Sequence, residues 1–364
     1  MHAHTSSAVP SHTARRRAAT SLLAAALCLI TATPARADFS GTDSLSKNRG
    51  NWQFVTLAGN SSLVFRNSRL EFLAPNPAAQ NTTGALWLPN FGSTTKPWFA
   101  QVDVHLDKPA MPDDSYLELG LSLESSSATT GVCGQMMTRY HAKDGPDGTD
   151  ITFKTQDGLF DGIGTSLKNA TLRLHYDPTR KHIVASVFDG YFWLYSKPLD
   201  VQPWKLKPGD VFYLSLIARN AGPTPDGLAL ASGPAHFKNF QCGPARPEIV
   251  VHQPAGTPIA DDKHTRTFGS VTLGKRGSMT FFLRNEGTRA LQNIAVRIDG
   301  VHAKDFIVSS APAAKILMPG EDTRFTISFR PKAAGNRKAK LHLLSNDADE
   351  ASFDVTLTGR GKNP

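Results

Sequence analysis

The stretch that decides the fold of the C-terminal part of this chain is residues 268–287, FGSVTLGKRGSMTFFLRNEG. Residues 278–284 read as an extended strand, in which successive side chains point to opposite faces. A turn at Gly274 and Gly277 precedes this run and residues 285–287 close it, so we predict a hairpin whose second strand pairs on both sides within a small antiparallel sheet. One face of that strand holds Met279, Phe281 and Leu283, and the other holds Thr280, Phe282 and Arg284.

The same pattern continues from this stretch to the end of the chain. With residues 249–251 included, the runs give seven or eight strands in about 115 residues, which predicts an immunoglobulin-like β-sandwich. This part has neither tryptophan nor cysteine, which excludes the antibody type of that sandwich. The further runs are residues 294–298, 306–308, 325–330, 339–343 and 353–358.

Residues 38–243 carry a different set of short alternating runs, separated by Gly, Pro, Asn and Asp. None of these runs has helical spacing over three turns. Ten or more such strands predict a sandwich of two sheets, because a single sheet of that size would leave one apolar face in water. The clearest runs are residues 62–66, 69–73, 99–106, 116–123, 151–155, 172–176, 183–188, 212–217 and 236–241.

The two parts are joined by residues 244–247, PARP, which read as a short and stiff linker because two of the four are proline. We therefore expect an all-β chain of two domains. The first spans residues 38–243, the second spans residues 248–361, and residues 362–364 form a tail.

Residues 1–37 read as a signal peptide and not as part of the fold. Three arginines at residues 15–17 precede an apolar run at residues 21–31 that is too short to span a bilayer, and residues 35–37 (ARA) fit an A-x-A cleavage site. We expect the mature chain to begin at Asp38 and the protein to be secreted or periplasmic, with the general secretory and the twin-arginine routes both open.

Charge and apolar content argue against two kinds of partner. The formal net charge of +9 falls to +5 without the leader, because the leader holds four arginines and no acid. An excess this small, spread along the chain, argues against a nucleic-acid-binding surface. Past the leader no apolar run approaches the ~18 residues that a membrane span needs.

Cys133 and Cys242 are the two cysteines outside the leader. In an exported chain two cysteines favour a disulfide over a metal site, because two thiols supply half of a structural zinc shell. We predict a disulfide between Cys133 and Cys242, with two buried free thiols as the alternative.

The order of strand-forming runs and turn residues in residues 38–243 is similar to that of the concanavalin A-like jelly rolls, the architecture of lectins, laminin-G domains and glucanases. The likeness rests on DFSG at residues 38–41, on LRLHYDPTRKHIVASVFDG at residues 172–190 and on HFKNFQ at residues 236–241. It implies a jelly-roll sandwich, but an architecture that serves many functions says less about the ligand.

Retaining glucanases of that architecture carry a Glu-x-Asp-x-(x)-Glu strand motif, and the nearest match is ELGLSLE at residues 118–124. Glu118 and Glu124 share a face of the strand, but six strand residues separate them by ~20 Å. Catalytic carboxylate pairs of glycosidases lie roughly 5 to 10 Å apart. The middle acid is missing as well, so we expect the protein not to be an enzyme.

Residues 247–361 resemble the bacterial choice-of-anchor D domain, which is related to the ASPM/SPD-2/Hydin immunoglobulin-like modules. The likeness is carried by FGSVTLG at residues 268–274, FFLRNEG at residues 281–287 and MPGEDTRFTISFRPKAAGNRKAKLHLLSNDADEASFDVTLTGRG at residues 318–361. It implies an exported bacterial protein with this module as a spacer. The family usually precedes a surface-anchoring tail, which this chain lacks at Pro364, so attachment to the cell surface stays open.

Tyr191, Trp193 and Tyr195 are the best candidates for a ligand-binding surface. In an extended strand all three lie on one side. Aromatic rings with polar tips suit sugars, which offer C–H faces for stacking and hydroxyl groups for hydrogen bonds. The alternative is that the three rings belong to the core.

Two groups of acidic residues are candidate Ca²⁺ sites, and a plain turn is the alternative for each. The first lies on a loop of the kind that holds Ca²⁺ in lectin-type sandwiches and comprises Asp144, Asp147 and Asp150. The second lies in a strand-connecting turn of the C-terminal domain and comprises Asp347, Asp349 and Glu350.

Two further sets of residues bear on possible binding or metal sites. Basic residues around a second turn either hold an anionic glycan or envelope phosphate or only face solvent; they are Arg330, Lys332, Arg337, Lys338 and Lys340. The histidines of residues 38–243 have no i, i+2 or i, i+4 spacing that would favour a metal site or a Ser/His/Asp set; they are His105, His141, His175, His182 and His236.

These observations predict an exported bacterial, non-catalytic binding protein. The jelly roll is expected to bind a carbohydrate or another cell-envelope ligand, with no cofactor other than Ca²⁺. A purely structural envelope or matrix protein is the alternative, and a glycan-active hydrolase is a third. The sequence leaves the ligand and the oligomeric state open.

Overall fold

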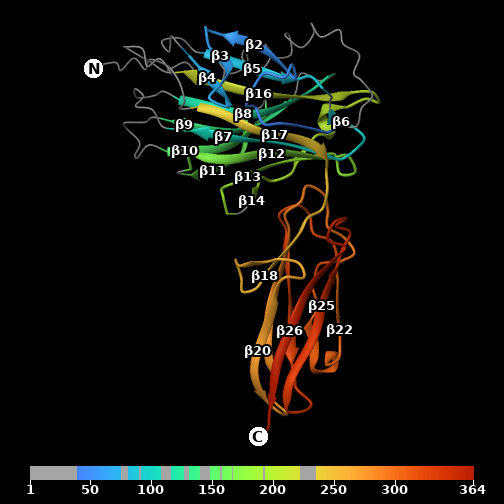
Figure 1. Ribbon diagram of the computed structural model, residues 1–364. Helices are drawn as coiled ribbons and strands as arrows, with labels where there is room; N and C mark the ends of the chain where they lie inside the picture. Colours follow the sequence, from blue (N-terminus) through green and yellow to red (C-terminus); the bar gives the residue numbers. More distant parts are fainter. Residues whose placement is uncertain are drawn as a thin grey trace, which may run out of the picture. The chain divides into compact units, whose positions relative to one another are not determined.

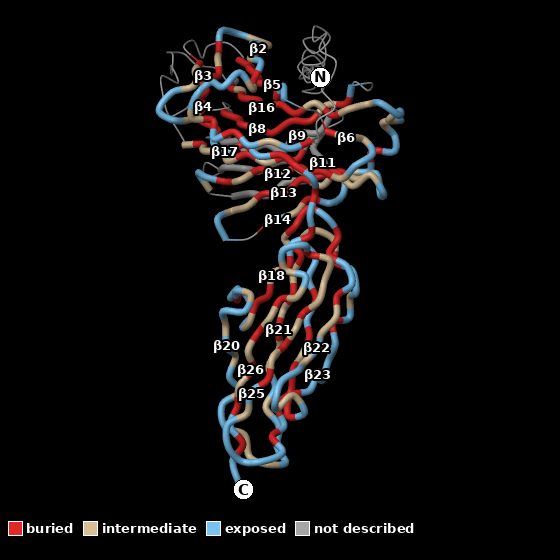
Figure 2. Tube along the Cα trace, turned by 45° about the vertical axis from the view of Figure 1, so that its right-hand side comes forward, coloured by how far each residue is buried: buried red, intermediate tan, exposed pale blue. Residues whose placement is uncertain are grey.

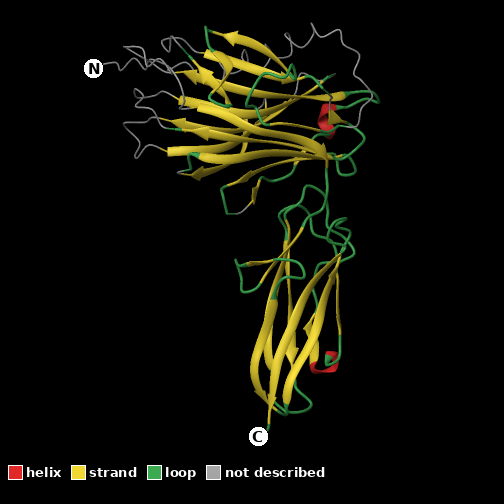
Figure 3. Ribbon diagram, in the orientation of Figure 1, coloured by secondary structure: helices red, strands yellow, loops and turns green. Residues whose placement is uncertain are grey.

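The computed structural model describes residues 39–74, 81–89, 92–107, 116–126, 131–139, 148–155, 158–165, 167–191, 193–221 and 235–364. These residues form strands joined by turns, with two short 3₁₀ helices, η1 (Gln202–Trp204) and η2 (Ala303–Asp305) (Figures 1 and 3). The chain divides into two compact units, Met1–Pro244 and Ala245–Pro364. The prediction of an all-β chain is therefore confirmed.

The first unit is a jelly-roll sandwich of two antiparallel sheets. The nine-stranded sheet has the order β14-β13-β12-β7-β17-β4-β3, with β1 beside β17 and β15 beside β13. Its strands are β1 (Gly41–Asp43), β3 (Ser62–Arg66), β4 (Arg69–Leu73), β7 (Trp98–Leu106), β12 (Asn169–Asp177), β13 (His182–Phe188), β14 (Trp193–Tyr195), β15 (Leu199–Asp200) and β17 (Ala235–Pro244).

The eight-stranded sheet has the order β11-β10-β9-β8-β16-β5-β2, with β6 beside β16. Its strands are β2 (Trp52–Ala58), β5 (Asn81–Trp87), β6 (Gly92–Ser93), β8 (Tyr116–Ser125), β9 (Gly131–Arg139), β10 (Gly148–Thr155), β11 (Gly158–Thr165) and β16 (Val211–Ala221). All nine runs predicted for this part of the chain fall within strands of the two sheets.

The pleat of each strand decides which side chains fill the space between the sheets. Along β7, buried and partly exposed residues alternate without a break, so every second side chain points into the core and the others point outward. The inward residues of β7 are Trp98, Ala100, Val102, Val104 and Leu106, and those of β8 are Leu117, Leu119, Leu121 and Leu123. Figure 2 shows the buried residues running along the strands of each unit.

The second unit is a smaller sandwich of the immunoglobulin-like kind. One sheet has five strands in the order β19-β18-β21-β24-β23, and the other has four in the order β20-β26-β25-β22. The strands are β18 (Ile249–His252), β19 (Pro258–Ile259), β20 (Thr265–Thr272), β21 (Gly277–Asn285), β22 (Ala295–Asp299), β23 (Phe306–Ser310), β24 (Asp322–Phe329), β25 (Gly335–Leu344) and β26 (Ser352–Lys362).

The strand predicted over residues 278–284 is confirmed as β21, which pairs with β18 on one side and β24 on the other. Its residues Phe281 and Leu283 are fully buried in the core of this unit. The predicted hairpin is wrong. The strand before the turn, β20, lies in the other sheet and pairs in parallel with β26, because the turn at Gly274 carries the chain from one sheet to the other.

The residues predicted as a linker belong to the two units. Pro244 is the last residue of β17 and is paired with Trp98. The carbonyl of Arg246 accepts hydrogen bonds from the backbone N–H groups of Thr288 (2.7 Å) and Arg289 (3.1 Å). The predicted leader, residues 1–37, lies outside the described residues. Among the residues that are described, no helix is long and apolar enough to cross a membrane.

Candidate functional site

The outward face of the nine-stranded sheet carries a row of polar side chains from strands that are far apart in the sequence. The register sets Asp103 of β7 opposite Thr171 of β12 on one side and opposite Lys238 of β17 on the other. One pleat further along, His105 lies between Asn169 and His236, the corresponding residues of the same two strands. Residues directly opposite each other in antiparallel strands share a face.

A pocket of about 290 Å³ lies over these two rows. The turn that follows β13 closes one side of it. The pocket is lined by Asp103, Val104, His105, Asn169, Ala170, Thr171, Phe188, Gly190, His236 and Lys238.

The carboxylate of Asp103 is held in one orientation by two donors. The hydroxyl of Thr171 donates to Oδ1 at 2.7 Å, and the amide of Asn239 donates to Oδ2 at 2.8 Å. Each oxygen of an ionised carboxylate can accept about two hydrogen bonds. The carboxylate therefore keeps acceptor capacity for a ligand while its orientation is fixed.

The imidazole of His105 is also fixed. Its Nδ1 lies 2.7 Å from Oδ1 of Asn169 and its Nε2 lies 3.2 Å from Oδ2 of Asp107. Its ring stacks on that of His236, with 4.5 Å between the centroids. Hydrogen bonds from Lys168 and His105 lower the pKa of Asp107, so this carboxylate is ionised at neutral pH.

The three aromatic residues predicted as a platform do not form one. The strand β14 begins only at Trp193, because the chain bends before it. The carboxylate of Asp189 accepts the N–H of Tyr191 at 2.8 Å in an Asx turn, and Gly190 has a φ of 99°. The ring of Tyr191 is 82% exposed, whereas Trp193 is only 9% exposed. Tyr195 lies opposite Ser186 of β13.

Trp193 is covered on one face by a cation. The guanidinium carbon of Arg173 lies 3.4 Å from the centroid of its ring, and the ring of Phe188 lies 5.4 Å away. Trp193 is also absent from the core between the sheets. It therefore lies on the outer face of the sheet, where it supports Phe188 at the edge of the pocket.

The other predicted site residues of the first unit are placed only in part. Asp144 and Asp147 lie outside the described residues, and Asp150 is in β10 at a position whose side chain is not described. Cys133 lies in β9 opposite Ser122, again without a described side chain. Cys242 is buried in the core, and burial raises the pKa of its thiol to about 12. The disulfide stays a prediction.

The strand that resembles the glucanase motif is β8. Glu118 and Glu124 alternate with its core leucines and therefore share the outward face of the eight-stranded sheet, with Gly120 and Ser122 between them. Nη1 of Arg219 lies 3.5 Å from Oε1 of Glu118. Burial raises the pKa of Glu124 to about 7. Among the described side chains of β8, no acid stands between the two glutamates on this face.

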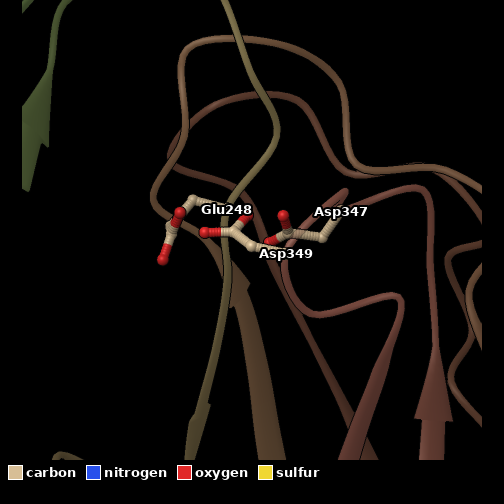
Figure 4. Close-up of side chains that lie close together, drawn as sticks. All are labelled: Glu248, Asp347 and Asp349. Atoms are coloured by element: carbon tan, nitrogen blue, oxygen red, sulfur yellow. The ribbon is translucent and has the colours of Figure 1, made fainter.

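An acidic cluster lies in the second unit (Figure 4). Carboxylate oxygens of Glu248, Asp347 and Asp349 lie within 4.8 Å of one another, a spacing at which a divalent cation can bridge them. The sequence pointed to Asp347, Asp349 and Glu350. Glu350 is not one of the three clustered acids, and the sequence missed Glu248, which precedes β18 and joins the other two only through the fold.

Protonation of its carboxyl groups can relieve the repulsion within the cluster in place of a cation. Burial first, and then the neighbouring charges of Asp347 and Asp349, raise the pKa of Glu248 to about 7. Burial raises the pKa of Asp347, and a hydrogen bond from Asp347 lowers the pKa of Asp349. Oδ2 of Asp347 accepts the backbone N–H of Ile249 at 2.8 Å, which gives this side chain a structural role.

Comparisons with known proteins give one family match. Residues 256–362 match the family described as Cep192 domain 4. This is not the choice-of-anchor D family, which stays a resemblance. No curated protein sequence matches the chain.

Eight solved structures that are similar to the chain each align with 55 to 57% of it. Lectin UEA-II complexed with galactose has 11% identity and a TM-score of 0.37 over 56% of this chain and 97% of its own. Peanut lectin with a 9mer peptide has 12% identity and a TM-score of 0.39 over 57% and 98%. The CBM2 module of the evolved Dit of Lactobacillus casei BL23 phage J-1 has 4% identity and a TM-score of 0.40 over 57% and 96%.

Proposed function

We propose that the first unit binds a carbohydrate in the pocket over β7, β12, β13 and β17, and that the chain is an exported, non-catalytic binding protein. The observation that carries the proposal is the lining of the pocket, which sets a fixed carboxylate, an amide and an ammonium group beside an aromatic ring. The second unit would act as a spacer.

The chemistry of the lining suits a sugar. Hydroxyl groups both donate and accept, so they can bond to the carboxylate of Asp103, the amide of Asn169 and the ammonium of Lys238. The ring of Phe188 offers a surface for the C–H face of a pyranose. Because Asp103 and His105 are already held by protein partners, binding would cost little additional side-chain entropy.

The lining also favours binding over hydrolysis. Glycosidases of the common kind use two carboxyl groups on either side of the scissile bond. Among the described residues that line this pocket, Asp103 is the single acid. We therefore propose that the bound glycan is released unchanged, and turnover of a bound glycan would contradict this part of the proposal.

The test begins with a glycan array probed with residues 38–364, with and without Ca²⁺. Each hit is then titrated calorimetrically against the wild type, Asp103→Asn and Lys238→Gln. We expect both variants to lose about tenfold or more in affinity, as the loss of a hydrogen bond to a charged group predicts. Lys207→Gln removes an exposed lysine of the same unit outside the pocket and should bind as the wild type does. Equal binding by all three variants would contradict the proposed site.

A further inference from the structure

The second unit has a cationic pocket at one end of its five-stranded sheet. It has a volume of about 420 Å³, and its lining includes Lys275, Arg276, Ile307, Ser309, Ser328 and Arg330. The two cations Lys275 and Arg276 lie in the turn before β21, and Arg330 follows the last residue of β24. Because β24 pairs with both β21 and β23, these segments meet at the same end of the sheet.

The positive charge of this pocket is not neutralised locally. None of its three cations forms an ion pair with an acid among the residues that the structure describes, and no acid lines the pocket. Asp305 is a buried acid two residues before Ile307 in the chain. Its Oδ2 lies 3.5 Å from Nε of Arg337, so this carboxylate already has a partner outside the pocket. Cations gathered in a concave site without counter-charges attract anions.

Hydroxyl groups complete the lining. Ser328 is 5% exposed, and its hydroxyl donates to that of Ser309 at 2.9 Å. The hydroxyl of Ser309 in turn donates to the carbonyl of Thr326 at 3.2 Å. The side chain of Ile307 is 47% exposed beside them and adds an apolar surface.

We propose that this pocket binds a ligand that carries two or more phosphate or sulfate groups. Guanidinium groups bind such oxyanions through two parallel hydrogen bonds, and an ammonium group adds a third positive charge. A volume of about 420 Å³ is in the range of small-molecule sites and exceeds what one orthophosphate fills. This site is independent of the pocket in the first unit.

Calorimetric titration of the full chain with tripolyphosphate and with orthophosphate tests the proposal. We expect tripolyphosphate to bind at least about tenfold more tightly, and its affinity to fall as NaCl is added, because salt screens exposed charges. Arg330→Gln and Arg276→Gln should each weaken tripolyphosphate binding by roughly tenfold. Melting curves establish that each variant is folded.

Arg324→Gln is the matched control. Arg324 is exposed and lies on β24, six residues before Arg330, which follows the end of that strand. At about 3.3 Å per extended residue, this separates the two arginines by roughly 20 Å. This variant should bind as the wild type does. Equal losses in Arg324→Gln and Arg330→Gln would mean that only net charge matters, and they would overturn the proposal.

Vesicles distinguish the source of the anionic group. Co-sedimentation with cardiolipin vesicles, whose headgroup carries two phosphates, that depends on Arg330 would identify a lipid headgroup as the ligand. Binding of tripolyphosphate without co-sedimentation would identify a soluble or polymeric phosphate. If neither probe binds at low salt, the proposal is wrong.

Discussion

The change Trp193→Ala distinguishes two roles of this ring: a buried packing residue, or an exposed surface on which a sugar stacks. The structure places Trp193 on the outer face of the sheet, 9% exposed, beneath Arg173 and against Phe188. The variant therefore loses a buried ring and not a surface on which a sugar could stack.

The expected cost can be worked out from those contacts. Truncation of a core aromatic residue costs roughly 3 to 5 kcal/mol. Trp193 is outside the core cluster, so we expect a smaller value, about 2 to 4 kcal/mol, of which the cation–π contact contributes about 0.5 to 2 and the aromatic pair about 0.5 to 1.5. For a unit of this size the melting temperature should fall by roughly 4 to 16 °C.

Calorimetric melting of the full chain measures this fall, and a double-mutant cycle with Arg173→Gln measures the contribution of the cation. We expect the single variants to be non-additive, with a coupling energy of about 0.5 to 2 kcal/mol. An unchanged melting temperature together with a tenfold loss of glycan affinity would refute the reasoning, because that combination identifies an exposed platform.

Three further predictions concern stability. Burial lowers the pKa of His175 to about 3, so the fold loses up to about 4 to 5 kcal/mol of stability as pH falls from 6.5 towards 3. Acid denaturation curves of His175→Leu should show a smaller loss over this pH range. Gly287→Ala places a Cβ against the carbonyl oxygen of Arg246, so urea titration should show a loss of about 2 to 3 kcal/mol in the second unit. A wild-type curve would contradict this packing. Ionisation of Glu248 opposes folding as pH rises above about 4.5, so Glu248→Gln should raise the melting temperature at pH 8 and leave it unchanged at pH 4.

The sequence predicted the strands well because their signal is local. The alternation of residues 99–106 follows directly from a strand with one face in the core, and β7 shows that alternation without a break. The predicted hairpin failed because strand pairing is not local. β20 pairs with β26, some 90 residues later in the chain, and nothing in the turn at Gly274 indicates that partner.

The site was harder to predict for the same reason. His105 and His236 have no short-range spacing, yet they stack because β7 and β17 are neighbours in the sheet. Asp103 and Thr171 likewise meet only through the register. The aromatic triplet was misread because the prediction took residues 191–195 as one strand, whereas Gly190 and the Asx turn delay the strand to Trp193.

The cation that covers Trp193 also had no signal in the sequence. Arg173 reaches it from β12, across β13, and an arginine on the outward face of a strand reads as an ordinary exposed residue. A pattern of aromatic residues can show that rings share a face, but only the tertiary packing shows whether that face is open.

The most direct test of the central claim compares two phenylalanines on the same outward face. Phe188 lines the pocket, whereas Phe99 lies on β7 outside it, and both are partly exposed. With the glycan selected on the array, calorimetric titration should show a loss of affinity of about tenfold for Phe188→Ala, in line with the loss of a stacking ring, and an unchanged affinity for Phe99→Ala. Full affinity in Phe188→Ala, or equal losses in the two variants, would contradict carbohydrate binding at this pocket.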